Sequence, residues 1–112
     1  MLQIFGRLKN HETQKTLRWY KERRIAHQFI DLKERSFSHG ELRDIGRFIA
    51  LKELIDENSP EYKKMGLAYL EFDPLGLLLE KPILLRGPLV RTKNAVTIGY
   101  KPEIWKLWFN LG

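Results

Sequence analysis

The sequence predicts a single α/β domain with a four-stranded mixed sheet, and three stretches lead to this fold class. Residues 2–32 hold an apolar run, an amphipathic segment and a second apolar run, which is typical of a β-α-β unit. Residues 38–80 carry repeated signals for helix starts. Residues 88–109 predict a β-hairpin followed by a helix. We therefore expect one domain over residues 1–112, with a helical insertion at about residues 38–80.

The first strand is expected at residues 2–5, followed by a short loop and a helix of about residues 11–23. Asn10 stands just before this helix, where its side-chain oxygen can accept a hydrogen bond from an unpaired backbone N–H. The first N–H groups of such a helix point at the loop and form a site for an anion or a reactive side chain. The apolar face of the helix is expected to carry Thr13, Leu17, Trp19 and Tyr20.

A second strand is expected at residues 25–32, close enough to the first helix to pair in parallel with the first strand. The helical middle then begins at Ser38, which forms a capping box with Glu41. Helices are expected at about residues 39–49, 51–55 and 60–67, the last one ending near Gly66, and another starts at residue 74. Two of these starts are a capping residue followed by proline, Ser59-Pro60 and Asp73-Pro74.

The second half of the sheet is expected to be a hairpin led by Pro88. Proline cannot donate a bond to a β-ladder, so it belongs at the first residue of a strand, and here a cis peptide bond is an option. Strands at residues 89–91 and 95–100 flank a polar turn at Lys93-Asn94. A final helix of about residues 102–109 should close the core with Ile104, Trp105, Trp108 and Phe109.

Composition limits the class of protein. The 43% of hydrophobic residues argues against disorder, and no apolar run approaches the roughly 18 to 20 residues of a membrane span, so we expect a cytoplasmic protein with no membrane role. The absence of cysteine excludes disulfides, thiolate catalysis and cysteine-ligated metal. The net charge of +6 permits attraction to nucleic acid, but the 14 interspersed acidic residues favour a solvated basic face.

Seven stretches, in their order and spacing, resemble the arsenate reductase and Spx-like family, which has a glutaredoxin-related, thioredoxin-like fold with a helical insertion. The resemblance covers nearly the whole chain and implies the same fold. The matching stretches are Ile4-Phe5-Gly6 with Glu12-Thr13-Gln14-Lys15, Phe29-Ile30-Asp31-Leu32, Leu42 in its capped helix, Tyr62-Lys63-Lys64-Met65-Gly66-Leu67, Lys81-Pro82-Ile83-Leu84, Pro88-Leu89-Val90 and Ile98-Gly99-Tyr100.

The resemblance places the family's nucleophilic cysteine at Asn10 or, with a shift of one residue, at His11. Asn10 is preferred because it leaves Thr13 at the second position of the family's Cys-x-x-Cys or Cys-x-x-Thr pattern. A cysteine at a helix N-terminus is activated because the helix stabilises the thiolate. Asparagine keeps the cap and lacks that chemistry.

The family's anion-binding arginines are also absent by this comparison. Gly87 stands where arsenate reductases have arginine before the proline, Tyr100 replaces a second arginine, and Asp56 falls near a third. Arg86 and Arg91 could substitute in part if their side chains turn toward the loop. The ligand-binding candidates are therefore Asn10, Thr13, Arg86, Pro88 and Arg91.

These observations favour a redox-inactive member of the family, without a cofactor, that binds a protein partner; contact with RNA polymerase is one version that the resemblance implies. The alternative is a glutathione-linked thiol reductase or arsenate-reductase-like enzyme that uses an external thiol near Pro88, or His11 as a base. Nucleic-acid binding is disfavoured because Trp19 and Tyr20, among the basic residues of the first helix, are expected in the core. His27 and His39 are too isolated for a metal site.

Overall fold

The computed structural model describes residues 1–111 and contains one four-stranded mixed sheet, in the order β2-β1-β3-β4. β1 pairs in parallel with β2 and antiparallel with β3, and β3 pairs antiparallel with β4. This confirms the predicted fold class. The strands are β1 (Gln3–Gly6), β2 (Gln28–Asp31), β3 (Leu89–Arg91) and β4 (Val96–Ile98).

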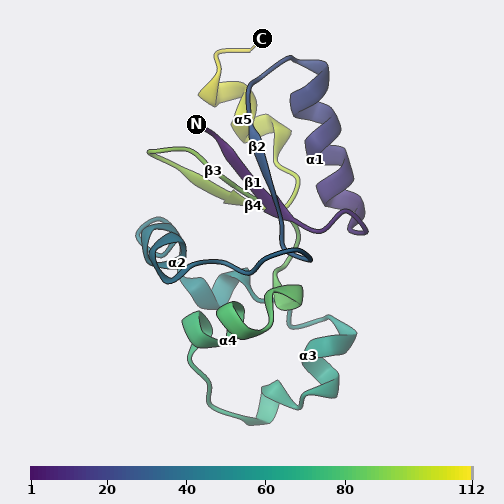
Figure 1. Ribbon diagram of the computed structural model, residues 1–112, viewed down its shortest axis with the longest axis vertical. Coiled ribbons are helices and arrows are strands. Elements are labelled where there is room, and N and C mark those ends of the chain that lie inside the picture. The colour runs from purple at the N-terminus through teal and green to yellow at the C-terminus, as the bar shows by residue number, and fades with distance from the viewer. Residues whose placement is uncertain (112) are drawn as a thin grey trace.

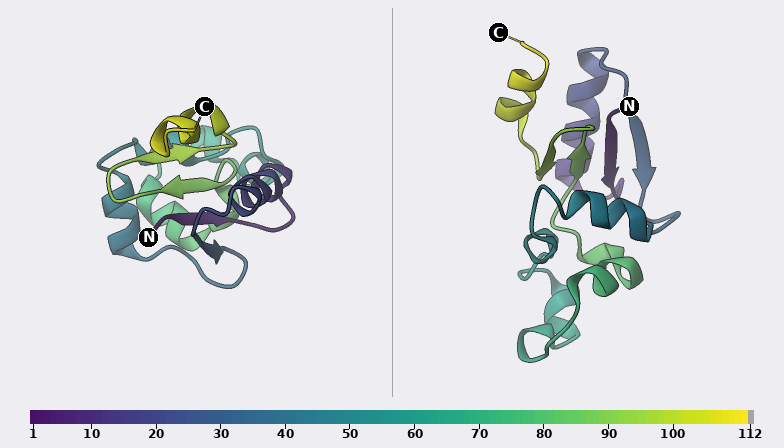
Figure 2. Two further views of the ribbon diagram at one scale, coloured as in Figure 1. Left: turned by 90° about the horizontal axis from the view of Figure 1, so that it is seen from above. Right: turned by 90° about the vertical axis from the view of Figure 1, so that its left-hand side faces the viewer.

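Helices flank the sheet and form a lobe beyond one of its ends (Figure 1), which gives the molecule an elongated shape of 45 × 27 × 24 Å. Both α1 and α5 lie beside the sheet, whereas the lobe holds the helices of the chain's middle (Figure 2). No helix within residues 1–111 is long and apolar enough to cross a membrane. The helices are α1 (His11–Glu22), α2 (His39–Ile45), α3 (Pro60–Lys64), α4 (Pro74–Glu80) and α5 (Pro102–Trp108), with 3₁₀ helices η1 (Leu51–Leu54), η2 (Leu67–Tyr69) and η3 (Pro82–Leu84).

Alternation along the strands divides the apolar residues between two cores. Phe5 and Leu89 face the lobe, where they pack with Leu42, Leu78 and Leu84 in a first core that joins the sheet to the helical lobe. The opposite face of the sheet packs against α1 and α5 in a second core. The buried members of this second core are Leu2, Ile4, Trp19, Tyr20, Val90 and Trp105.

The four helix starts expected from capping residues are confirmed. Asn10 caps α1, and Ser38 caps α2 in a complete capping box. Ser59 accepts a hydrogen bond from the N–H of Tyr62, and Asp73 caps α4 in the same manner. These signals are local, so the sequence alone can show them.

Several element ends differ from the prediction. The second strand begins at Gln28 and not at residue 25, because the N–H of Ile25 is bonded to the carbonyl of Tyr20 and Arg24 is left-handed, with φ of 55°. α2 ends at Ile45 and not at residue 49, since the N–H of Gly46 closes the last helical turn on Leu42. The turn before β2 and the turn after α2 therefore shorten these two elements.

The structure corrects two details expected for the C-terminal half. No peptide bond among the described residues is cis, so the bond before Pro88 is trans; Gly87, with φ of 96°, makes the turn there. In α5, Trp105 is buried and its indole N–H donates to Thr97, and Trp108 and Phe109 pack partly buried against the second core. Ile104, by contrast, is 36% exposed, because it lies outside the apolar stripe that this short helix presents to the sheet.

Candidate functional site

The loop between β1 and α1 is set by close packing of Gly6 against Thr13. A Cβ atom added at Gly6 would lie 2.6 Å from the Thr13 hydroxyl oxygen, so only glycine fits. Thr13 itself is fully buried. The strand and the helix thus approach as closely as their backbones allow, and the loop between them is held in one shape.

Asn10 completes this shape with its side chain. Its Oδ1 atom accepts the backbone N–H of Thr13 at 2.9 Å and the Thr13 hydroxyl at 3.1 Å. The position that the family resemblance gives to a nucleophile therefore holds an amide whose oxygen is already engaged. An amide has no ionisable proton near neutral pH, so it cannot replace a thiolate.

Glu12 ties the start of α1 to the proline loop and to the end of the hairpin. Its Oε1 atom accepts the N–H of Tyr100 at 3.1 Å, across 88 positions of sequence. Its carboxylate also lies over Gly87 and Gly99, both left-handed, where an added Cβ would come within 3.4 and 3.5 Å of it. Nothing local in the sequence indicates this contact. The negative charge of Glu12 therefore lies beside Gly87 and Tyr100, the two positions at which the resemblance places arginines.

A cavity of about 290 Å³ opens between this loop and the helical lobe. Its charged lining residues are Arg7, Asp56 and Glu61, so acidic groups outnumber basic ones. Such a lining opposes an oxyanion. The remaining lining residues are Gly6, Asn10, Thr13, Leu32, Asn58, Ser59, Pro60, Pro82, Ile83, Leu85 and Gly87.

The structure brings some of the predicted ligand-binding residues together and separates others. Asn10 and Thr13 line the cavity, and Pro88 follows Gly87, which also lines it. Arg86 is exposed and does not line the cavity. Arg91 lies at the opposite end of β3, where it pairs with Gln3 at the start of β1.

His11 and a bound metal ion are the two remaining candidates for a reactive group. His11 is exposed at the first position of α1, and no hydrogen bond to its ring occurs within this range. No group of three or more His, Asp or Glu side chains there is placed to hold a metal ion. The site is therefore a shaped surface with hydrogen-bonding groups and a net acidic lining.

The strand order, with α1 following β1 directly, defines a thioredoxin-fold protein. Its β1–α1 loop carries the amide of Asn10 at the position where the resemblance places a thiol. The chain belongs to the ArsC family, whose model matches residues 5–107. The predicted relation to the arsenate reductase family, without its catalytic cysteine, is thereby confirmed.

Solved structures support the same fold. A protein named YffB superimposes with a TM-score of 0.85 at 17% identity, covering 96% of this chain and 97% of that one. An ArsC-family-related protein from Bacteroides fragilis gives 0.80 at 22% identity, covering 95% and 97%. An arsenate reductase from Vibrio cholerae gives 0.78 at 22% identity, covering 92% of each chain. No curated protein matches the sequence. At these identities the likeness shows the fold alone.

Proposed function

We propose that this chain is a redox-inactive member of the ArsC family that binds a protein partner through the surface around the β1–α1 loop. The observation that carries the proposal is the Asn10 amide at the head of α1, bonded twice to Thr13. The loop keeps its shape with no reactive atom. An ordered loop of this kind can serve as a binding surface without a reactive atom.

The negative charge around the loop also favours a binding role over arsenate or thiol chemistry. Asp56 and Glu61 line the cavity, and Glu12 lies over the glycines beside it. Negative groups weaken the binding of arsenate and disfavour a thiolate at the same place. This surface suits neutral or basic groups of a partner better than an anionic substrate.

In the proline loop, the backbone N–H that an extended thiol ligand could use before Pro88 is already engaged. The N–H of Gly87 is bonded to the carbonyl of Leu85 at 2.9 Å, inside the turn. An incoming glutathione would have to break this bond before it could use the donor. Apolar groups at the rim, Leu8 at 54% exposed and Ile83 at 36%, instead favour contact with a protein side chain.

The first arm of the test measures redox chemistry. We expect the purified chain to reduce neither a disulfide nor arsenate with glutathione above a boiled control. We also expect Asn10→Cys to be no more active than Leu8→Cys, which places a thiol on the same loop without the helix cap. Reduction by the unchanged protein, well above the boiled control, would refute the proposal.

The second arm measures partner binding from an extract of the source cells. Leu8→Asp alters the β1–α1 loop, whereas Tyr69→Asp changes a residue in η2 of the lobe that is more exposed, at 92% against 54% for Leu8. We expect a protein that the unchanged chain and Tyr69→Asp retain, and that Leu8→Asp retains about tenfold less, because the substitution puts a charge into the contact surface. Equal retention by both variants would place the partner elsewhere.

A further inference from the structure

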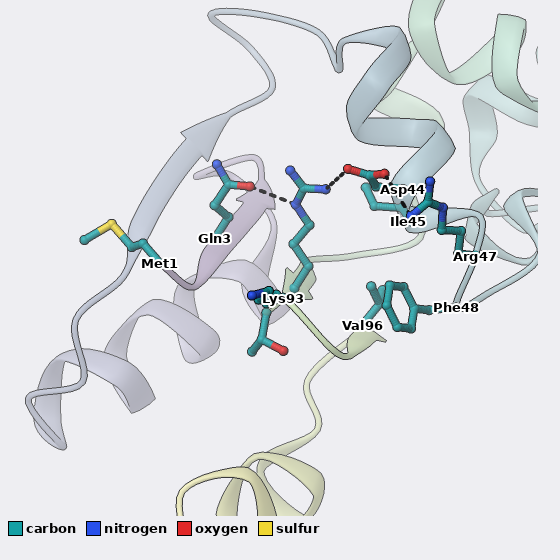
Figure 3. A pocket seen from close by; sticks show the side chains of 10 residues that line it. Met1, Gln3, Asp44, Ile45, Arg47, Phe48, Lys93 and Val96 are labelled. Atoms are coloured by element: carbon teal, nitrogen blue, oxygen red, sulfur yellow. Dashed lines mark hydrogen bonds and ion pairs between the residues drawn. The ribbon is translucent and has the colours of Figure 1, made fainter.

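A second cavity, of about 490 Å³, lies away from the β1–α1 loop, between the β3–β4 turn and the end of α2 (Figure 3). Its floor is one row of residues across the sheet, in which Gln3 pairs with Arg91 and Arg91 with Val96. The next row on the same face, Phe5 and Leu89 among it, belongs to the first core. In the floor row, the polar Gln3 and Arg91 therefore stand beside β-strand positions that are apolar in the next row, while Val96 still packs against the first core.

Hydrogen bonds across this row fix the guanidinium of Arg91. Gln3 donates to Gln28 at 3.1 Å and accepts the Nε–H of Arg91 at 2.8 Å. The guanidinium also lies 5.6 Å from the ring centre of Phe5. Its side chain is only 19% exposed. The charge is thus partly removed from water and held in one orientation before any ligand arrives.

Most donors of this guanidinium have no partner within residues 1–111. Of its five N–H groups, only Nε–H makes a hydrogen bond there. Asp44 is the nearest carboxylate, and its Oδ2 atom lies 4.0 Å from Nη1, too far for a hydrogen bond. A guanidinium stays charged at any ordinary pH, so its free donors call for an anion.

The rest of the lining defines what kind of anion fits. Arg47 and Lys93 add two cations to Arg91, against the single acidic residue Asp44, and the excess of two positive charges matches a phosphate monoester dianion better than one carboxylate. Gln3 and Asp44 reach the cavity from opposite sides in Figure 3. Phe48, 49% exposed, provides an aromatic surface. The volume is that of a small-molecule site.

We propose that this cavity binds a small phosphate monoester that carries an aromatic group. Arg91 takes the phosphate oxygens through its free N–H groups, because its planar fork matches the spacing of two such oxygens. Arg47 and Lys93 complete the neutralisation, and the aromatic part of the ligand lies on Phe48. This cavity is separate from the β1–α1 surface, so the phosphate-binding proposal can be tested independently of the proposed protein-binding role.

The experiment titrates the full chain with adenosine 5′-monophosphate and with phenyl phosphate, followed by calorimetry and by amide chemical shifts. We expect saturable binding of at least one probe with a Kd below about 1 mM, and shifts centred on residues 91–96 and 44–48. Arg91→Gln should weaken binding about tenfold or more. Arg43→Gln, on α2 outside the cavity, removes the same charge and should leave the Kd within about twofold.

A second pair of variants tests the site without touching the packed Arg91. Asp44→Asn removes the one carboxylate that competes with phosphate, so it should tighten binding about two- to fivefold. Glu61→Gln removes a negative charge at the distant β1–α1 cavity and should change nothing. The proposal is overturned if neither probe binds saturably, if Arg91→Gln and Arg43→Gln act alike, or if Asp44→Asn fails to strengthen binding.

Discussion

Gly6 is the residue on which the geometry of the β1–α1 loop depends most. An alanine Cβ there would stand 2.6 Å from Thr13 Oγ1, far inside normal contact, and Thr13 is fully buried. We expect Gly6→Ala to lower the free energy of unfolding by about 1 to 3 kcal/mol, measured by urea denaturation. Thr13→Ala removes the two atoms nearest to the added Cβ and leaves a contact of 3.3 Å to the Cβ of residue 13, so in that background the further cost of Gly6→Ala should fall below about 1 kcal/mol.

Gly40 is the matched control for this clash. It lies in α2 with nothing within 4 Å of an added Cβ, so Gly40→Ala should stabilise the protein by about 0.5 to 1 kcal/mol. If Gly6→Ala proved as harmless as Gly40→Ala, the close approach of β1 and α1 would be wrong.

At the scale of the element, the start of α2 shows a helix cap that depends on charge. Glu41 accepts the N–H of Ser38 at 2.8 Å and two N–H groups of Arg35 at 3.0 and 2.9 Å. The hydrogen bonds from Arg35, followed by the Ser38 N–H, hold the pKa of Glu41 below its ordinary value of 4.5, against the opposing effect of burial. The same pairing raises the pKa of Arg35.

This lowered pKa links α2 to the pH dependence of stability. The unfolded carboxyl binds its proton more tightly than the folded one, so the stabilisation is complete above the unfolded-state pKa and is lost as the pH falls through the folded-state pKa. We expect Glu41→Gln to cost about 1 kcal/mol at pH 7 and to reduce the loss of stability between pH 5 and about pH 3. Urea denaturation at several pH values measures both.

Glu53 provides the control, because it is an exposed carboxylate on η1. Glu53→Gln should alter the stability at pH 7 by less than about 0.5 kcal/mol. If the free energy of unfolding of Glu41→Gln changed with pH in parallel with that of the unchanged protein, the hydrogen bonds between Arg35 and Glu41 would make no pH-dependent contribution to stability.

At the scale of the whole molecule, the sheet and the helical lobe share the first core, so we expect them to unfold as one cooperative unit. Leu84 of η3 is fully buried in the same core as Phe5 and Leu89 of the sheet. We expect Leu84→Ala to cost about 2 to 5 kcal/mol. Because all three tryptophans lie on α1 and α5, circular dichroism and tryptophan fluorescence should follow one shared transition, shifted together by this variant.

Leu70 serves as the comparison for Leu84, since it is 60% exposed after η2. Leu70→Ala should move neither transition by more than about 0.5 kcal/mol. A loss of helical signal that precedes the fluorescence change would mean that the lobe unfolds alone, against the shared core.

Across these scales, the sequence predicted the features that depend on neighbouring residues, and it did not predict contacts between residues far apart in the chain. The caps at Asn10 and Ser38, and the order of strands and helices, depend on neighbours within four residues or on periodicity, which a sequence displays. The Glu12–Tyr100 and Gln3–Arg91 bonds each join residues 88 positions apart, so nothing in the sequence marks them. The capped start of α1 could therefore be predicted from the sequence, while the acidic lining of the nearby cavity and the separate position of Arg91 required the structure.

For the proposed protein partner, the bonds that Glu12 and Asn10 make lead to an expected rate of binding. They close the β1–α1 loop on Tyr100 and Thr13 before anything docks, so the surface needs no rearrangement at the moment of encounter. Association should then be limited by diffusion and orientation, at about 10⁵ to 10⁷ M⁻¹s⁻¹, and differences in affinity between partners should arise in how slowly they leave.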